Sequence, residues 1–120
     1  MSKKTVVIGA TPDSSRFAYK AATMLKNFGH EFVPVGIKKG EVAGITILND
    51  MPHIDDVHTV TLYVGPQNQG SLEDYIINLK PKRIIFNPGT ENDHLIRLAK
   101  DNKIEAVLGC TLVMLSVGTY

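Results

Sequence analysis

The sequence has very little cysteine: Cys110 is the one cysteine among its 120 residues. A single thiol cannot form an internal disulfide and offers no cysteine pair for zinc, so we expect a protein of a reducing compartment, by default the cytoplasm. Long apolar runs are missing too. No segment approaches the roughly 18 consecutive apolar residues of a membrane span, and the N-terminal residues lack the apolar core of a signal peptide. We therefore expect no membrane partner.

A marked excess of charge of either sign is also absent. The chain has 13 Lys and Arg residues against 12 Asp and Glu residues, which gives a formal net charge of +1. This balance provides no general attraction to nucleic acid, so a bound anion must be held by local groups. The histidines show no spacing typical of a metal site, and we predict no bound metal. These histidines are His30, His53, His58 and His94.

What is present is the pattern of an α/β protein. Short apolar, β-branched runs predict about five strands, over residues 5–10, 31–36, 57–64, 83–86 and 105–110. Helical spacing predicts helices over 16–28 and over 71–79, with Ser71 as the cap of the second. A third helix is predicted from Thr90 onward, with Thr90 as its cap. Strands that alternate with helices predict a Rossmann-like, doubly wound, mostly parallel sheet with helices on both faces. We expect residues 1–120 to form a single domain.

Two segments have weaker patterns. Residues 38–56 are interrupted by glycine and proline, which predicts a loop with a brief edge strand over 45–48. The apolar tail, residues 111–120, is expected to pack on its own sheet. Alternatively, it provides a surface for a second copy of the chain or for a larger protein.

The turn after the first predicted strand has the residues of an anion site. Doubly wound sheets bind phosphates where the first strand turns into a helix. Gly9 allows a close approach of the backbone. The hydroxyls of Thr11, Ser14 and Ser15 can donate hydrogen bonds, and Arg16 can pair with a phosphate. An ordinary turn in which Ser14 or Ser15 caps the helix explains the same residues, so both interpretations stay open.

Missing signatures narrow the choice of ligand. The G-x-G-x-x-G fingerprint requires a second glycine where Thr11 stands, and no G-x-x-x-x-G-K-[ST] loop occurs. An NAD site has an acidic residue at the end of the second strand, which bonds the ribose hydroxyls. At this position the sequence has Lys38 and Lys39 instead. Two lysines there can hold the ribose phosphate that NADP and coenzyme A both carry. The alternative is that both are solvated loop lysines.

Four short segments are informative together. They are VVIGAT over 6–11, FVPV over 32–35, VAGI with L-x-x-M-P over 42–52, and VLGC over 107–110. In this order they resemble the small stand-alone CoA-binding domain family, which is similar to the nucleotide-binding domain of the succinyl-CoA synthetase alpha chain. The chain departs from the family where Gly36 replaces a common Asn, and where the apolar tail replaces a Pro and an acidic residue.

The resemblance implies that the protein binds coenzyme A or an acyl-CoA, a small-molecule nucleotide ligand. It implies phosphate contacts at Gly9, Ala10, Thr11, Ser15 and Arg16. It implies an adenosine end near Val35, Gly36, Lys38 and Lys39. It also implies a pantetheine path past Val64, Gly65, Pro88 and Gly89. Cys110 either approaches the ligand thiol or packs as a small apolar residue.

No set of catalytic residues is recognisable. Thr90, Asn92 and Cys110 are expected near the sulfur end, and none has an evident base partner. His94 is a candidate base, although a histidine at a helix start is more often simply exposed. We therefore predict a binding protein and no enzyme. Two alternatives stay open: a small NADP-dependent reductase, and an interaction subunit with a vestigial nucleotide site that forms a homodimer or docks on a larger protein.

Overall fold

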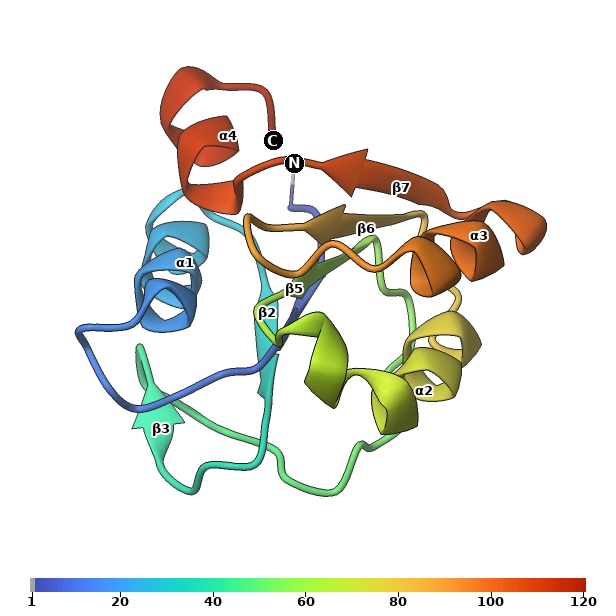
Figure 1. Cartoon of the computed structure of the whole chain (residues 1–120). Helices are drawn as coiled ribbons and strands as arrows, with labels where there is room; N and C mark the ends of the chain where they lie inside the picture. Colours follow the sequence, from blue (N-terminus) through green and yellow to red (C-terminus); the bar gives the residue numbers. More distant parts are fainter. Residues whose placement is uncertain (1) are drawn as a thin grey trace.

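Five short parallel strands form the central sheet of the protein (Figure 1). The structure is a computed structural model and describes residues 2–120. The sheet has the order β2-β1-β5-β6-β7, and all neighbouring strands pair in parallel. This arrangement confirms the predicted Rossmann-like α/β fold. The strands are β1 (Thr5–Ile8), β2 (Phe32–Val35), β5 (Thr59–Leu62), β6 (Arg83–Phe86) and β7 (Glu105–Leu108).

The three central strands are buried along their whole length, whereas the two edge strands are not. Every residue of β1, β5 and β6 is buried. Burial on both faces explains why these strands are rich in apolar and β-branched residues. The exception is Arg83, the first residue of β6. The edge strand β7 is only partly covered, and Leu108 is 64% exposed.

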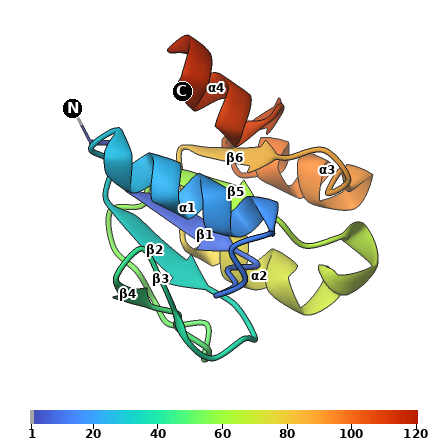
Figure 2. The same ribbon diagram turned by 90° about the vertical axis from the view of Figure 1, so that its left-hand side faces the viewer.

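Helices cover both faces of this sheet (Figure 2). One face carries α1 (Phe17–Asn27) and α4 (Thr111–Val117), and a shared core contains Val7, Leu25 and Leu115. The other face carries α2 (Glu73–Asn78) and α3 (Asp93–Asp101), whose apolar side chains pack on Val60 and Phe86. Helix α4 is the apolar tail of the sequence. The expectation that this tail packs on its own sheet is confirmed.

The segment between β2 and β5 differs from the prediction of a brief edge strand over 45–48. It forms a small antiparallel hairpin of β3 (Glu41–Val42) and β4 (Ile45–Thr46), separate from the main sheet. Beyond the hairpin, Leu48 forms an isolated parallel bridge to Val35. This bridge returns the chain to the outer edge of β2, beside the carboxyl end of that strand.

Two predicted helix caps are wrong. The segment expected to start at Ser71 begins with two 3₁₀ turns, η1 (Pro66–Asn68) and η2 (Gly70–Leu72), so Ser71 lies inside a turn. Helix α3 is capped by Asn92, whose side chain accepts from the backbone N–H groups of His94 and Leu95. The Thr90 hydroxyl instead donates to the carbonyl of Asn87, at 2.8 Å.

The order of the strands creates a crevice between β1 and β5. From β1 the chain first adds β2 on one side and then crosses back to place β5 on the other. In sheets of this topology, ligands bind outside the carboxyl ends of the strands where this switch occurs. Within residues 2–120, no helix is long and apolar enough to cross a membrane.

Candidate functional site

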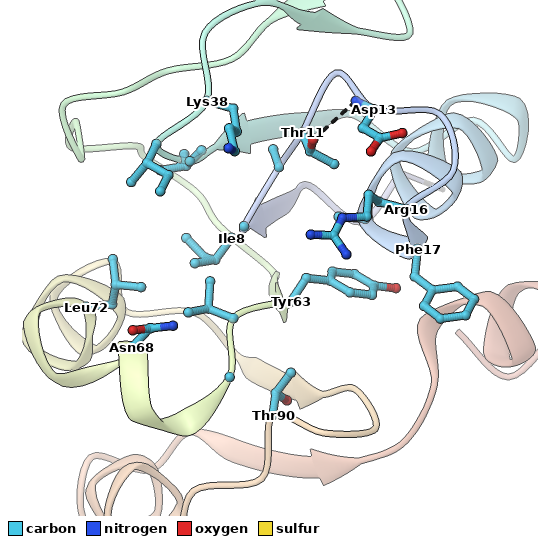
Figure 3. Close-up of a pocket in the computed structure, with 18 of the residues that line it drawn as sticks. Ile8, Thr11, Asp13, Arg16, Phe17, Lys38, Tyr63, Asn68, Leu72 and Thr90 are labelled. Atoms are coloured by element: carbon cyan, nitrogen blue, oxygen red, sulfur yellow. Dashed lines mark hydrogen bonds between the residues drawn. The ribbon is translucent and has the colours of Figure 1, made fainter.

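A pocket of about 1130 Å³ lies at the switch point of the sheet (Figure 3). Its walls are the segments that follow β1, β2, β5 and β6, joined by the first turn of α1. Most of the residues named from the sequence line this one pocket. They are Gly9, Ala10, Thr11, Ser15, Arg16, Val35, Gly36, Lys38, Val64, Gly65, Pro88 and Gly89.

Five residues considered from the sequence do not line the pocket: Ser14, Lys39, Asn92, His94 and Cys110. Lys38 and Lys39 are adjacent and both exposed, but only Lys38 lines the pocket. The two lysines that look equivalent in the sequence are therefore not equivalent in the structure. Cys110 is half-buried and precedes α4.

Gly9 allows β1 to approach the neighbouring strand closely. The residue has φ of +94°, and a Cβ atom added there would lie 2.8 Å from the carbonyl oxygen of Tyr63. The backbone N–H groups of Gly9 and Ala10 both donate to the Val35 carbonyl, at 2.9 and 3.1 Å. Glycine at position 9 is therefore required by the positive φ and by the backbone at the end of β5.

Helix α1 begins at the pocket without a side-chain cap. Its N-cap residue is Arg16, and no side chain accepts from the first turn. The interpretation in which Ser14 or Ser15 caps this helix is therefore wrong. Because the first N–H groups of a helix have no partner within the helix, this end offers donors and a partial positive charge. Phe17 and Ala18, the first two residues of α1, line the pocket.

The loop before α1 is ordered by Asp13. Its Oδ1 atom accepts from the backbone N–H of Ser15 at 3.0 Å and from the Ser15 hydroxyl at 2.7 Å. Hydrogen bonds from the side chain and the backbone of Ser15 lower the pKa of Asp13, which favours its ionised form. The Ser15 proton is thus engaged with Asp13. The Thr11 hydroxyl accepts from the backbone N–H of Asp13 at 3.2 Å and keeps its own proton for a ligand.

The titratable side chains of the pocket are two cations, one carboxylate and one phenol. Arg16 and Lys38 are exposed cations, and Asp13 offsets part of their charge. Burial raises the pKa of Tyr63 to about 12, so its ring lines the pocket as a neutral group. Figure 3 shows Arg16, Tyr63 and Phe17 together on one side of the pocket, with Thr11 and Lys38 nearer the loop after β2.

Asn49 is a site residue that the sequence did not reveal. Its amide nitrogen donates to the carbonyls of Gly36 and Lys38, each at 2.9 Å, and the residue lines the pocket. Asn49 therefore holds the loop that carries Lys38. An Asn side chain at position 36 would not fit, because a Cβ atom there would lie 2.6 Å from the carbonyl oxygen of Ala10. This contact explains the departure from the family pattern at Gly36.

The far end of the pocket is formed by the turns after β5 and β6. Asn68 and Leu72, from the segment after β5, lie here with Thr90, from the turn after β6 (Figure 3). His94 does not line the pocket. Its Nδ1 atom lies 2.8 Å from the carboxylate of Glu73, which is also outside the lining. Among residues 2–120, no group of three or more His, Cys, Asp or Glu side chains could hold a metal ion.

Comparison with protein families gives one match. The model of a CoA binding domain matches residues 3–116. A comparison with curated proteins found no match. Among solved structures, an uncharacterised protein is 61% identical and has a TM-score of 0.98, with 100% of this chain and 99% of that chain covered.

More distant structures share the fold. A hypothetical protein from Pyrococcus horikoshii OT3 is 24% identical with a TM-score of 0.87, and the match covers 97% of this chain and 83% of that chain. An acetyl-coenzyme A synthetase from Ca. Korarchaeum cryptofilum, in complex with phosphate and ADP, is 18% identical with a TM-score of 0.73. That match covers 91% of this chain and 26% of the synthetase chain. With the family match over almost its whole length, this chain belongs to the CoA-binding domain family.

Proposed function

We propose that this protein binds coenzyme A or an acyl-CoA and does not transform it. The observation that carries the proposal is the uncapped start of α1, which opens into the large pocket beside Arg16 and Lys38. Membership of the CoA-binding domain family favours this ligand over other phosphorylated nucleotides.

The pyrophosphate of the ligand would bind at the turn between β1 and α1. Backbone N–H groups at the start of a helix bind phosphate through hydrogen bonds and the helix dipole. Thr11 adds a hydroxyl donor, and Arg16 adds a guanidinium that can pair with two phosphate oxygens. These donors outweigh Asp13, whose carboxylate already accepts two hydrogen bonds from Ser15.

The adenosine end would lie near Val35 and Gly36, with Lys38 on the 3′-phosphate. Asn49 fixes the backbone of this loop through two carbonyls, so Lys38 extends from an ordered segment. The pantetheine arm would pass Val64, Gly65, Pro88 and Gly89. A pocket of about 1130 Å³ has room for a ligand of this size.

The absence of turnover is supported by the kind of side chains at the pocket. Of the described residues that line it, none is His, Cys or Glu, and the hydroxyl groups of Ser15, Ser71, Thr11 and Thr90 have no imidazole partner. Thioester hydrolysis requires a nucleophile or water activated by a base. Among the described residues, Asp13 is the one carboxylate of the lining, and its Oδ1 atom already accepts two hydrogen bonds from Ser15. The His94–Glu73 pair lies outside the lining.

Thermal unfolding with different nucleotides tests the proposal. At about 100 times its Kd, a ligand that binds only the folded state stabilises it by about 2.7 kcal/mol. We expect CoA and acetyl-CoA to raise the melting temperature strongly, dephospho-CoA to raise it less, and NAD to leave it unchanged. A larger shift with NADP than with CoA would favour a reductase. No shift with any nucleotide would contradict binding at this pocket.

Assays of turnover test the second part of the proposal, that the protein does not transform the ligand. Incubation with acetyl-CoA or a longer acyl-CoA, and separately with NADPH, should give no product above background. Thioester hydrolysis that disappears in His94→Ala would contradict the proposal and make His94 a catalytic base.

A further inference from the structure

A glutamine is completely buried behind the wall of the pocket. Gln69 lies between η1 and η2 and has 0% of its surface exposed, although it does not line the pocket itself. Its Nε2 atom donates to the carbonyl oxygens of Val64 and Thr90, both at 2.8 Å. Its Oε1 atom accepts from the Asn92 amide at 2.9 Å. Both amide protons and the carbonyl oxygen of the side chain are thus engaged.

The two carbonyls belong to the two loops that form the far end of the pocket. Pairing between β5 and β6 ends at Leu62 and Phe86, and beyond this pair no ladder joins the chains. Val64 follows β5 and Thr90 follows β6, and both residues line the pocket. The Gln69 carboxamide is hydrogen-bonded to both loops where the sheet no longer joins them. Asn87 joins the ends of the two strands themselves, through its amide and the Leu62 carbonyl. Further out, at Val64 and Thr90, the Gln69 side chain contributes to the separation of the loops.

Asn92 holds the carboxamide in its orientation. Besides Gln69, its Nδ2 atom donates to the Glu73 carboxylate at 2.9 Å, and its Oδ1 atom caps α3. The network therefore joins the first turns of α2 and α3 to the two loops. Because buried carbonyls without a partner are costly, loss of the Gln69 amide would let the loops move until other donors or water satisfy them.

From this network we infer that Gln69 is a positioning residue for the pantetheine arm of the ligand. This inference rests on the proposed function, in which the arm passes Val64 and Gly89. The nucleotide end of the pocket, at Thr11, Arg16 and Lys38, has no hydrogen bond to Gln69 or Asn92 in the structure. Gln69 should therefore govern the affinity of whole CoA and leave the affinity of its nucleotide part unchanged.

Two ligands measured on the same variant separate positioning from a general structural role. Gln69→Met keeps the approximate volume of the side chain and removes both donors. We expect its affinity for CoA to fall about tenfold, which corresponds to 1.4 kcal/mol. Its affinity for adenosine 3′,5′-bisphosphate, which lacks the pantetheine arm, should stay within about twofold of the wild type. Equal losses for both ligands, or no loss for CoA, would overturn the inference.

A second variant covers the case in which Gln69→Met does not fold. Asn92→Ser keeps a cap oxygen for α3 and removes the donor that orients Gln69. It should show the same loss for CoA alone, and equal losses for both ligands would again overturn the inference. If the wild-type protein binds neither ligand, the proposed function fails first, so the two failures are distinguishable. Circular dichroism and the melting temperature confirm that each variant is folded when binding is measured.

Discussion

At the scale of single residues, the structure separates side chains that look alike in the sequence. Lys38 and Lys39 are adjacent, equally charged and both exposed, yet Lys38 alone of the two lines the pocket. No periodic pattern could predict this difference, because it depends on how Asn49 returns to bond the carbonyls of Gly36 and Lys38. The general position of a cation after β2 was predictable, whereas the identity of the lysine was not.

The lysine pair gives a matched test at this scale. If Lys38 meets the 3′-phosphate, Lys38→Gln should weaken CoA binding about tenfold, because one charge-assisted contact is lost. Its affinity for dephospho-CoA should not change. Lys39→Gln removes the same charge one residue further along and should bind both ligands as the wild type does. Titration calorimetry measures all four affinities, and equal effects of the two variants would contradict the assignment.

At the scale of elements, the strands follow from the sequence and the helix ends do not. The apolar, β-branched runs at β1, β5 and β6 predict buried strands because a parallel sheet is covered on both faces. Caps depend on a few backbone angles, and several polar residues before a helix compete for the role. Ser71 and Thr90 have suitable side chains, yet Ser71 lies in a 3₁₀ turn and Thr90 bonds to Asn87.

The cap of α3 can be checked against the cap that the sequence suggested. Asn92→Ala removes the acceptor for His94 and Leu95 and the donors to Gln69 and Glu73. We expect the free energy of unfolding to fall by about 1–2 kcal/mol. Ser71→Ala changes a side chain that caps nothing, so its effect should stay within about 0.5 kcal/mol. Urea unfolding of both variants compares them, and a larger loss for Ser71→Ala would contradict the structure.

At the scale of the whole molecule, the candidate pocket and the opposite end of the sheet have different chemistry. At the amino ends of the strands, Lys3, His30 and Arg83 lie around Tyr120. His58 is linked to this cluster through Thr59, which also accepts from Arg83. Burial lowers the pKa of His30 and of His58, and nearby Lys3 and Arg83 lower both further. The His30 Nδ1 atom also accepts from the backbone N–H of Lys3 at 3.0 Å, which requires an unprotonated Nδ1 atom.

This cluster predicts how stability depends on pH. A histidine with a lowered pKa in the folded state is protonated more readily when the chain unfolds. The neutral histidine therefore contributes its full stability to the folded state above the unfolded-state pKa of 6.5. This contribution is lost as the pH falls through the lower pKa of the histidine in the folded state. The urea midpoint should fall between pH 7 and pH 5. The double variant His30→Gln, His58→Gln should show a smaller fall, and a fall equal to that of the wild type would contradict this origin of the pH dependence.

The overall topology also follows from the sequence, and the composition of the pocket follows only in part. Alternating strands and helices fix a doubly wound sheet, and that sheet places the first turn at the switch point. Residues such as Tyr63 and Asn68 reach the pocket through the path of the chain after β5. From the sequence, Tyr63 is recognisable only as the end of a strand and Asn68 only as part of a turn, so their place in the pocket could not be predicted.

Amide chemical shifts during a CoA titration show directly whether the ligand binds at this pocket. Each backbone N–H of the ¹⁵N-labelled protein reports whether its surroundings change when the ligand binds. If CoA binds at the pocket, the largest shifts should occur over residues 9–18, 36–38, 63–65 and 88–90, where the pocket opens. Only small shifts should occur over 80–82 and 102–104, which lie at the opposite end of the sheet. Largest shifts at that opposite end, or unchanged spectra at millimolar CoA, would contradict the account.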